Sequence, residues 1–248
     1  MSGEIGALLA TGRVPPDPAA LAAALPDLPR WVETRWMLRE GAGWARTADG
    51  GMGVVVVAQD LRLGAVVGRP DPGVLRSALH DAAPGFALVV QLSDLAHVRA
   101  ALAGWAAPVL ATIHRLPARA PAEAPPDPGV VVLAPPHGEL VSRLPPDMRR
   151  EAPYATALAV QLADGIPVSM CQATAVTETL WDAGVETAEG HRRRGHASAC
   201  FRALDAYMAA VGKEPVWGVE EGNRASIELA RKLGFEAVEQ LAVMRPRP

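Results

Sequence analysis

The chain has 248 residues, of which 50% are hydrophobic, and its formal net charge is −3. This length gives room for one large domain or two ordinary ones, and the apolar content excludes a disordered chain. The small negative charge predicts no general attraction to nucleic acid or to an anionic membrane surface.

Cysteine content and the N-terminus bear on the cellular compartment. Cys171 and Cys200 are too few for a disulfide framework, so we expect reduced thiols in a cytoplasmic protein. The N-terminus carries Glu4 and lacks a basic region followed by a long apolar run, so no signal peptide is expected. The longest apolar runs, such as residues 54–58, are too short to span a bilayer, and no membrane partner is expected.

A proline-rich stretch, PARAPAEAPPDPG at 117–129, is the clearest break in the chain. Prolines deny hydrogen bonds to helices and to strand ladders, so the stretch is typical of an extended linker. We therefore predict an N-terminal α/β domain of unknown role over 1–116, a linker over 117–128 and a second domain over 129–248.

The N-terminal part mixes expected helices and strands. In chain order they are a helix ending before Pro26, a strand over 52–60, a helix over 72–83, a strand over 85–92, a helix over 93–104 and a strand over 108–116. Ser93 is expected to cap the 93–104 helix, and Gly104 is expected to end it.

Two features of this part are candidates for a site. Trp31, Trp36 and Trp44 are able to line a substrate cleft, but large aromatic side chains more often anchor a core, and we favour the core. The glycine cluster at 50–53 precedes a strand, whereas a phosphate loop should follow a strand and open a helix. A turn is expected there.

The C-terminal part is more regular. The expected elements are a strand over 129–134, a helix over 137–144, a strand over 154–162, a hairpin turn over 163–167, strands over 168–180 and 181–187, a helix over about 195–211, a strand over 215–220, a helix over 224–233 and a strand over 235–244. The 195–211 helix carries a single apolar stripe, formed by Ala197, Phe201, Leu204, Met208 and Val211.

The most informative segment leads from the 181–187 strand into that helix. Arg192, Arg193 and Arg194 precede Gly195, and the helix follows. The first turn of a helix has amides without intrahelical partners, the helix dipole adds positive potential, and a glycine lets a phosphate approach. A solvated face or a nucleic-acid patch are the alternatives, but three arginines in an acidic protein are a poor footprint for nucleic acid. The order predicts a ligand that carries a pyrophosphate.

Two motifs in the C-terminal half match a known family. RRRGHA at 192–197 fits a pyrophosphate loop of the form Q/R-x-x-G-x-G/A, and NRASIELARKLGF at 223–235 fits N-x-x-S/A-x-x-L-A-x-K-L-G-F. With these motifs in order, residues 129–244 resemble the GNAT superfamily of acyl-CoA-dependent N-acetyltransferases. The resemblance implies an α/β (α+β) fold with a mixed, mostly antiparallel central sheet and flanking helices. The smaller α/β domain before it carries no such motif; a degenerate copy of the same fold is one interpretation.

The resemblance also implies where acetyl-CoA would bind. Backbone groups of the strand before the loop would pair with the pantetheine arm, and the loop amides and arginines would hold the pyrophosphate. Asn223 would cap its helix and contact the pantetheine region. The implied cofactor-binding residues are Val185, Glu186, Thr187, Arg192, Arg193, Arg194, Gly195, His196, Ala197, Asn223 and Ser226.

The catalytic groups are less well defined. Asp182 is the first candidate for the general base, in the strand where the family carries a glutamate, and Glu220 is the second. Glu178 and Glu186 are weaker options, and each of these carboxylates has the alternative role of a solvated or ion-paired side chain. Many members of the family have a tyrosine general acid seven residues after the asparagine, where this chain has Ala230.

The expected function is N-acetyl transfer from acetyl-CoA to a primary amine of a small molecule, by direct attack in a ternary complex. The alternatives are a non-catalytic GNAT-like protein that senses acyl-CoA and an enzyme that uses a longer acyl donor. His191 and His196 flank the loop without a carboxylate or cysteine at ligand spacing, so no metal site is expected. No nucleic-acid partner is expected, and a homodimer is left open.

Overall fold

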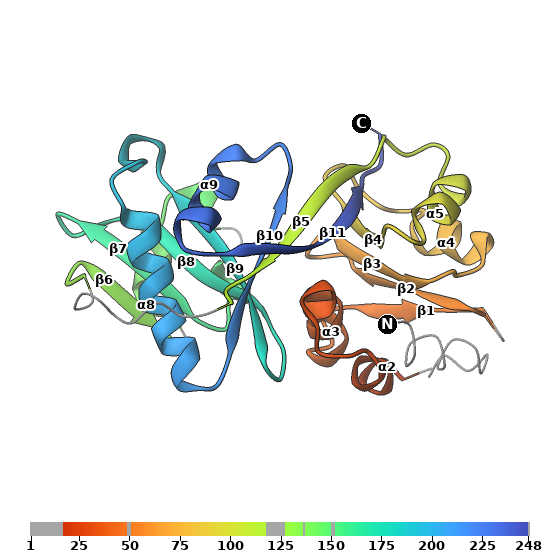
Figure 1. Ribbon diagram of the computed structural model, residues 1–248, viewed down its shortest axis with the longest axis horizontal. Coiled ribbons are helices and arrows are strands. Elements are labelled where there is room, and N and C mark those ends of the chain that lie inside the picture. Colours follow the sequence, from red (N-terminus) through yellow and green to blue (C-terminus); the bar gives the residue numbers. More distant parts are fainter. Residues whose placement is uncertain (1–16, 49–50, 118–126, 136, 150–151, 248) are drawn as a thin grey trace. The chain divides into compact units, whose positions relative to one another are not determined.

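Figure 1 shows the computed structural model of the chain. It describes residues 17–48, 51–117, 127–135, 137–149 and 152–247. Most of the expected linker and the N-terminal residues around Glu4 lie outside the described residues. The chain forms two compact units, the first from Met1–Ile113, Val219–Asn223 and Val238–Pro248 and the second from His114–Gly218 and Arg224–Ala237. The domain boundaries expected from the sequence stay a prediction.

The first unit is a mixed sheet with helices on both faces (Figure 1). Its sequential elements are α2 (Pro18–Ala24), η1 (Pro29–Trp31), α3 (Val32–Arg39), β1 (Trp44–Arg46), β2 (Gly53–Ala58), β3 (Leu63–Gly68), α4 (Pro72–Ala78), β4 (Ala87–Gln91), α5 (Leu95–Ala101) and the start of β5 (Val109–Arg115). The strand order is β1-β2-β3-β4-β11, where β11 (Glu236–Met244) enters from the end of the chain. The β3–β4 pair is parallel, and the other neighbours in this order are antiparallel.

The valine run of β2 explains why the first unit needs two helical layers. Val54 and Val56 pack with α2 and α3, whereas Val55 and Val57 pack with α4 and α5. Because neighbouring side chains of a strand point to opposite faces, an unbroken apolar run can be buried only when both faces are covered. All four valines are at most 1% exposed.

The second unit also has strands in mixed pairing. Its elements are β6 (Val130–Leu133), α6 (Gly138–Ser142), α7 (Pro146–Arg149), η2 (Ala152–Tyr154), β7 (Leu158–Ala163), β8 (Ile166–Val176), β9 (Leu180–Thr187), η3 (Glu189–His191), α8 (His196–Ala210), β10 (Glu214–Glu220) and α9 (Arg224–Lys232). The strand order β10-β9-β8-β7-β6 is antiparallel except for the parallel β9–β10 pair. The expected hairpin turn joins β7 to β8, with Asp164 and Gly165 both at positive φ.

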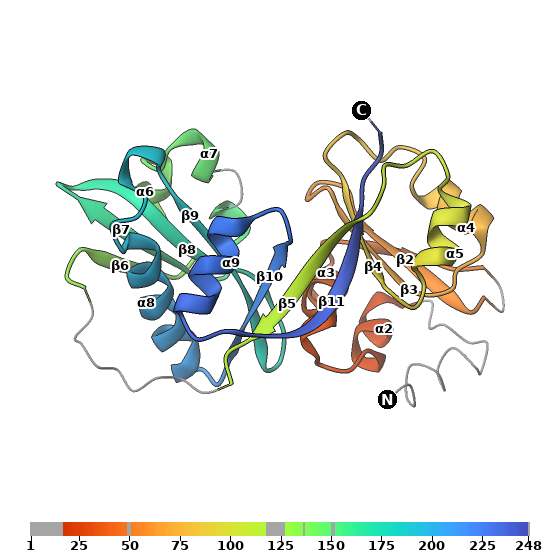
Figure 2. The ribbon, with the colours of Figure 1, turned by 45° about the horizontal axis from the view of Figure 1, so that its top comes forward.

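Helices cover both faces of the second unit's sheet. On one face α8 crosses β7, β8 and β9 (Figure 1), and its Phe201 stacks on Trp181 of β9, with ring centroids 5.9 Å apart. Phe201 also packs against Trp217 and Phe235, which fixes β10 and the end of α9 to the same helix. The segment with α6 and α7, seen in Figure 2, covers the other face, where Met148 packs with Met170 and its neighbours. The fold class expected from the sequence, a mixed sheet with flanking helices after a smaller α/β unit, is confirmed.

Several details of the expected helices are wrong, and the helix expected over 72–83 ends at Ala78. Helix α5 begins at Leu95, with Asp94 rather than Ser93 at the N-cap position, and ends at Ala101 instead of running to Gly104. The shift has a local cause, because the Asp94 amide closes a turn onto the Gln91 carbonyl. The apolar stripe of α8 is also shorter than expected, since Val211 lies after the helix and is 60% exposed.

The three tryptophans are used differently. Trp31 is buried and Trp36 packs against the same core, as favoured from the sequence. Trp44 is exposed on β1, where the Arg46 guanidinium lies 5.0 Å from its ring centroid. Among the described residues, no helix has the length and apolar character needed to cross a membrane.

Gly53, the last glycine of the expected turn, makes a close backbone contact that can be tested. A Cβ there would lie 2.4 Å from the Pro70 nitrogen and 2.5 Å from the Arg69 nitrogen. Backbone atoms cannot move aside as a flexible side chain does, so Gly53→Ala should destabilise the protein by about 1–3 kcal/mol in chemical denaturation. Gly104→Ala is the matched control, because nothing lies within 4 Å of its Cβ. Equal stability of both variants would contradict this close packing.

Candidate functional site

The strands β9 and β10 separate within the second unit. Their parallel ladder pairs Glu214 with Leu180, Pro215 with Trp181, and Val216 with Asp182. Beyond Asp182, β9 continues to Thr187 while pairing with β8. The parallel ladder between the two strands therefore ends before β9 does.

The predicted pantetheine-binding residues lie in this last part of β9. Val185, Glu186 and Thr187 are half-buried, and they lead directly to the loop before α8. Two of their carbonyls already accept hydrogen bonds: the Ser169 hydroxyl donates to the Glu186 carbonyl at 2.9 Å, and Arg192 Nε donates to that of Thr187 at 3.2 Å. The geometry brings these residues next to the loop, as the resemblance implies.

The start of α8 has no cap from the side chain of its N-cap residue. Gly195 occupies that position with φ 90°, and a glycine has no side-chain acceptor for the first-turn amides. The first bond onto the cap runs from the Ala199 amide to the Gly195 carbonyl, so the amides of His196, Ala197 and Ser198 precede it. Nothing lies within 4 Å of a Cβ built on Gly195. These amides, the positive end of the helix dipole and the open space at Gly195 favour an anion.

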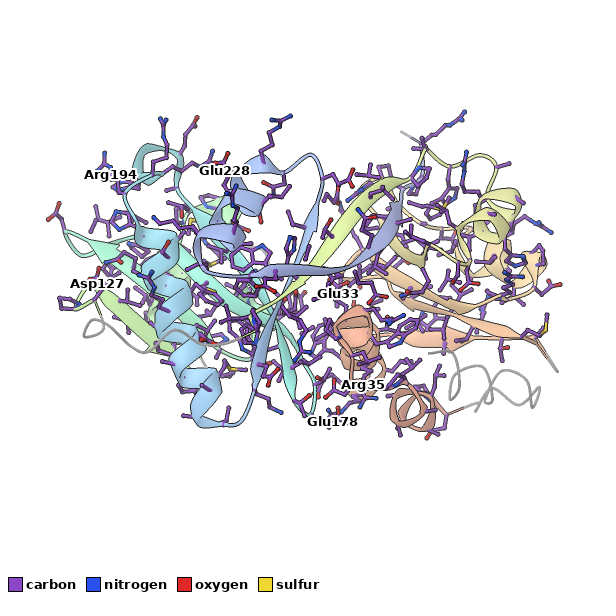
Figure 3. The ribbon with its side chains drawn as sticks, in the orientation of Figure 1. Glu33, Arg35, Asp127, Glu178, Arg194 and Glu228 are labelled. Carbon is purple, nitrogen blue, oxygen red and sulfur yellow. The ribbon has the colours of Figure 1, made fainter. Side chains whose placement is uncertain are left out.

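The basic residues before Gly195 differ in their contacts. Arg192, Arg193 and Arg194 are all exposed, and Figure 3 shows Arg194 at the turn that leads into α8. Arg192 points back to Thr187, as its Nε contact shows, whereas Arg193 has a left-handed backbone with φ 61°. A non-glycine residue in that conformation is strained, and such strain gathers at ligand-binding loops.

Two histidines flank the loop. The rings of His191 and His196 lie 6.2 Å apart between centroids. His191 Nδ1 is buried and has no hydrogen-bond partner among the described residues. A buried ring nitrogen without a partner costs free energy, so its position in this loop fits a polar ligand group. The described residues contain no group of three or more His, Cys, Asp and Glu side chains able to hold a metal ion.

Asp182, the first candidate base, lies where the β9–β10 ladder ends. Its carboxylate is half-buried and accepts a hydrogen bond of 2.9 Å from the Thr174 hydroxyl on β8. Thr174 therefore orients the carboxylate, a role that the sequence did not indicate. The pairing of β8 with β9 shifts between Ala173 and Val176. Counting residues back from the turn that joins β8 to β9 therefore does not place Thr174 beside Asp182.

The weaker candidates lie elsewhere on β9 or next to it. Glu178 is in the turn before β9, where the Lys213 ammonium donates to its carbonyl, and Figure 3 shows it far from Arg194, at the other end of that strand. Glu186 lies next to the loop, two residues after Gly184. A Cβ on Gly184 would lie 3.0 Å from Gln172 Cγ. Because Gly184 has no side chain, the Gln172 side chain can lie across β9 between Asp182 and Glu186.

Glu220, the second candidate base, belongs to the first unit, and Asp182 to the second. Both carboxylate oxygens of Glu220 are bonded to the Arg245 guanidinium, through Nη2 and, at 3.4 Å, through Nη1. The ion pair with Arg245 therefore engages both oxygens of Glu220, and Asp182 stays the first candidate for the base.

Helix α9 holds the second motif. Asn223 immediately precedes the helix, as expected of a cap residue, and its amide donates to the Glu220 carbonyl. Ser226 accepts a hydrogen bond of 2.9 Å from the Trp217 indole, so its hydroxyl joins α9 to β10. Ala230, at the position of the family's tyrosine, is fully buried and offers no general acid.

Both cysteines are free thiols in the core of the second unit. Burial raises the pKa of Cys200 to about 12, against an opposing hydrogen bond to Ser169. Burial, with further contributions from Cys200 and Asp182, also raises the pKa of Cys171 well above its ordinary value. Because the thiolate is the nucleophile, neither side chain is suited to carry an acyl group.

Comparison with known proteins bears on the family and the fold. Residues 159–244 match the family model described as GNAT acetyltransferase. A GCN5-related N-acetyltransferase-like protein from Streptococcus suis is 17% identical with a TM-score of 0.65, covering 92% of this chain and 96% of that one. A GCN5-related N-acetyltransferase from Kribbella flavida is 16% identical with a TM-score of 0.60, covering 88% and 95%.

A tandem GNAT protein from the clavulanic acid biosynthesis pathway is 14% identical with a TM-score of 0.54, covering 99% of this chain and 95% of that one. At these identities the structural likeness shows the fold alone. No curated protein sequence gave a significant match. The family model and the fold support acyl transfer in general, and the predicted resemblance of the C-terminal half to the GNAT superfamily is confirmed.

Proposed function

We propose that the protein transfers an acetyl group from acetyl-CoA to a primary amine of a small molecule, by direct attack in a ternary complex. The observation that carries this proposal is the uncapped start of α8, where Gly195 is open and basic residues precede it. We also propose that the protein is cytoplasmic, which the two free thiols favour.

The residues of the loop fit a coenzyme A pyrophosphate. The amides of His196, Ala197 and Ser198 would hold its oxygens, and Arg193 and Arg194 would add charge. The end of β9, from Val185 to Thr187, would pair with the pantetheine arm, because β10 no longer pairs with it there. The unpartnered His191 Nδ1 gives an additional polar contact for the ligand.

Asp182 supplies the proton transfer that the reaction needs. An alkyl amine is mostly protonated at neutral pH, so the Asp182 carboxylate, directly or through a water, accepts a proton from it. The freed amine lone pair then forms the new C–N bond at the thioester carbonyl, and a β9 amide stabilises the oxyanion. The C–S bond breaks, and the thiolate leaves without help from position 230, where alanine has no acidic group. The new amide nitrogen then loses its second proton to the departing thiolate, which gives the neutral amide and the free thiol.

Two observations favour a second function. The alanine at 230 and the ion pair on Glu220 both remove groups that would assist chemistry, which suits a protein that binds acyl-CoA without turnover. A longer acyl donor would present the same pyrophosphate to the start of α8 and is compatible with the same site. Turnover across a set of amines and acyl-CoA thioesters separates these functions.

The first test measures release of free thiol from acetyl-CoA with a panel of primary amines, together with coenzyme affinity. Gly195→Val should weaken coenzyme binding roughly 30- to 100-fold, or about 2–3 kcal/mol, because a β-branched residue disfavours φ 90° and displaces the amides. Gly190→Val is the control, because Gly190 lies in the same loop, has open space around its Cβ position and does not have a positive φ. Unchanged affinity in Gly195→Val refutes the proposed pyrophosphate site at the start of α8. Coenzyme binding by the wild type with no thiol release for every amine tested supports a non-catalytic acyl-CoA sensor.

A second test concerns the base. Asp182→Asn should lower kcat roughly 10²- to 10⁴-fold and remove the acidic limb of the pH–rate profile, while the coenzyme affinity stays unchanged. Glu228→Gln, on the exposed surface of α9 (Figure 3), is the control for loss of one negative charge. A variant with the wild-type rate and pH profile places the base elsewhere.

A third test separates direct attack from transfer through a cysteine. The folded Cys200 thiol stays protonated between pH 9.0 and about 12, whereas the unfolded thiol ionises, so this group's contribution to stability falls as the pH rises through that window. At pH 8 we expect iodoacetamide to leave the folded protein unmodified and active, and to modify both cysteines in denaturant. Rapid inactivation of the folded protein at stoichiometric modification is the result that contradicts direct attack.

A further inference from the structure

We propose that the first unit is a GNAT-like repeat whose coenzyme groove is closed by its own side chains, with the Asp71 carboxylate on the amides that a phosphate would take. The chain would then bind a single coenzyme, in the second unit. This inference rests on the proposed function of the second unit for the position of that one site.

The two units share one succession of elements. In the second unit, the antiparallel pair β8–β9 is followed by α8, by β10 parallel to β9, by α9 and by β11. In the first unit, the antiparallel pair β2–β3 is followed by α4, by β4 parallel to β3, by α5 and by β5. Helix α4 therefore corresponds to α8, and the loop before it corresponds to the basic loop of the second unit.

A side chain accepts hydrogen bonds from the first-turn amides of α4, whereas the N-cap glycine of α8 has no side chain to do so. Asp71 is the N-cap residue, and its Oδ1 accepts hydrogen bonds from the amides of Gly73 at 2.7 Å and Val74 at 3.3 Å. Pro72, at the first helical position, has no N–H to offer. A carboxylate of the protein thus takes the first-turn amides, and its charge would repel a phosphate.

Side chains also tie the loop before α4 to the loop before α5. Arg69 Nε lies 3.3 Å from Asp94 Oδ1, and Arg69 Nη2 donates to the Ser93 carbonyl at 3.5 Å. His97 Nε2 lies 2.7 Å from the Pro70 carbonyl oxygen. These contacts run from the segment that corresponds to the basic loop across to the following helix, where a coenzyme would have to enter.

The charges of the two loops also favour a phosphate only in the second unit. The segment Arg69–Pro72 carries one arginine, and Asp94 neutralises it. The segment Arg192–Gly195 carries three arginines, all exposed. Because affinity for a pyrophosphate depends on uncompensated positive charge and available amides, only the second loop is equipped for it.

Titration calorimetry of the full chain with coenzyme A tests the inference. We expect one site per chain in the wild type, with its affinity lowered roughly 30- to 100-fold in Gly195→Val. Two sites per chain, or a site of wild-type affinity in Gly195→Val that is lost when Asp71→Lys is added, would overturn it. Asp71→Ala should lower the unfolding temperature in the absence of ligand and change the coenzyme affinity less than twofold, whereas Asp71→Asn, which keeps the capping oxygen, should retain the wild-type unfolding temperature.

The two proposals fail differently. If coenzyme A does not bind to the wild type at all, the cradle at α8 is refuted, and the closure of the first unit is decided by the Asp71 series alone. An Asp71→Ala variant with the wild-type unfolding temperature shows that the carboxylate does not cap α4 and overturns the closure. Weaker coenzyme binding in Asp71→Ala, with an unchanged unfolding temperature, places a ligand at α4 and overturns it as well.

Discussion

The candidate site depends on the backbone amides in the first turn of α8, which receive no acceptor from the side chain of their N-cap residue. A helix start normally satisfies its amides with a capping side chain or with solvent. Here the cap is Gly195, which has no side chain to offer, and the preceding arginines add positive charge instead of an acceptor. The remaining fold holds this helix in place, through the stacking of Phe201 on Trp181 and its tilted contact with Trp217.

Helix α8 also links the anion site to the candidate base. Trp181 of β9 packs under Phe201, and the next residue, Asp182, has its side chain on the opposite face of the strand. Asp182 is also the last β9 residue that pairs with β10, so the candidate base lies at the end of that ladder. Packing on one face of β9 therefore positions the candidate base on the other.

The sequence predicted those elements whose local pattern and tertiary role agree. Helix α8, the valine strand β2 and the Asp-Gly hairpin are of this kind. Helix α3 was missed because Arg35 interrupts its apolar pattern: this arginine is buried, and its guanidinium donates to the carbonyls of Ala22 and Leu25. Its burial depends on contacts made across the chain, which no periodicity in the sequence records.

Close packing against the backbone also made strand β3 hard to predict from the sequence. Strand β3 was missed because glycines at 64 and 68 are atypical of a strand, yet a Cβ at 64 would lie 2.8 Å from the Phe86 ring. The candidate site shows the same limit. The loop, the glycine and the helix were predictable because they are contiguous, whereas the Thr174–Asp182 and Arg245–Glu220 contacts depend on strand register and on long-range pairing.

The contrast between Asp71 and Gly195 shows how little separates a closed helix end from an open one. Both residues occupy the N-cap of the helix that follows the first strand of a parallel pair. A carboxylate there stabilises its own helix by roughly 1 kcal/mol, through amides that then cannot serve a ligand. A glycine gives up that stabilisation and leaves the amides to an external anion. One side chain thus decides whether this helix start serves stability or binding.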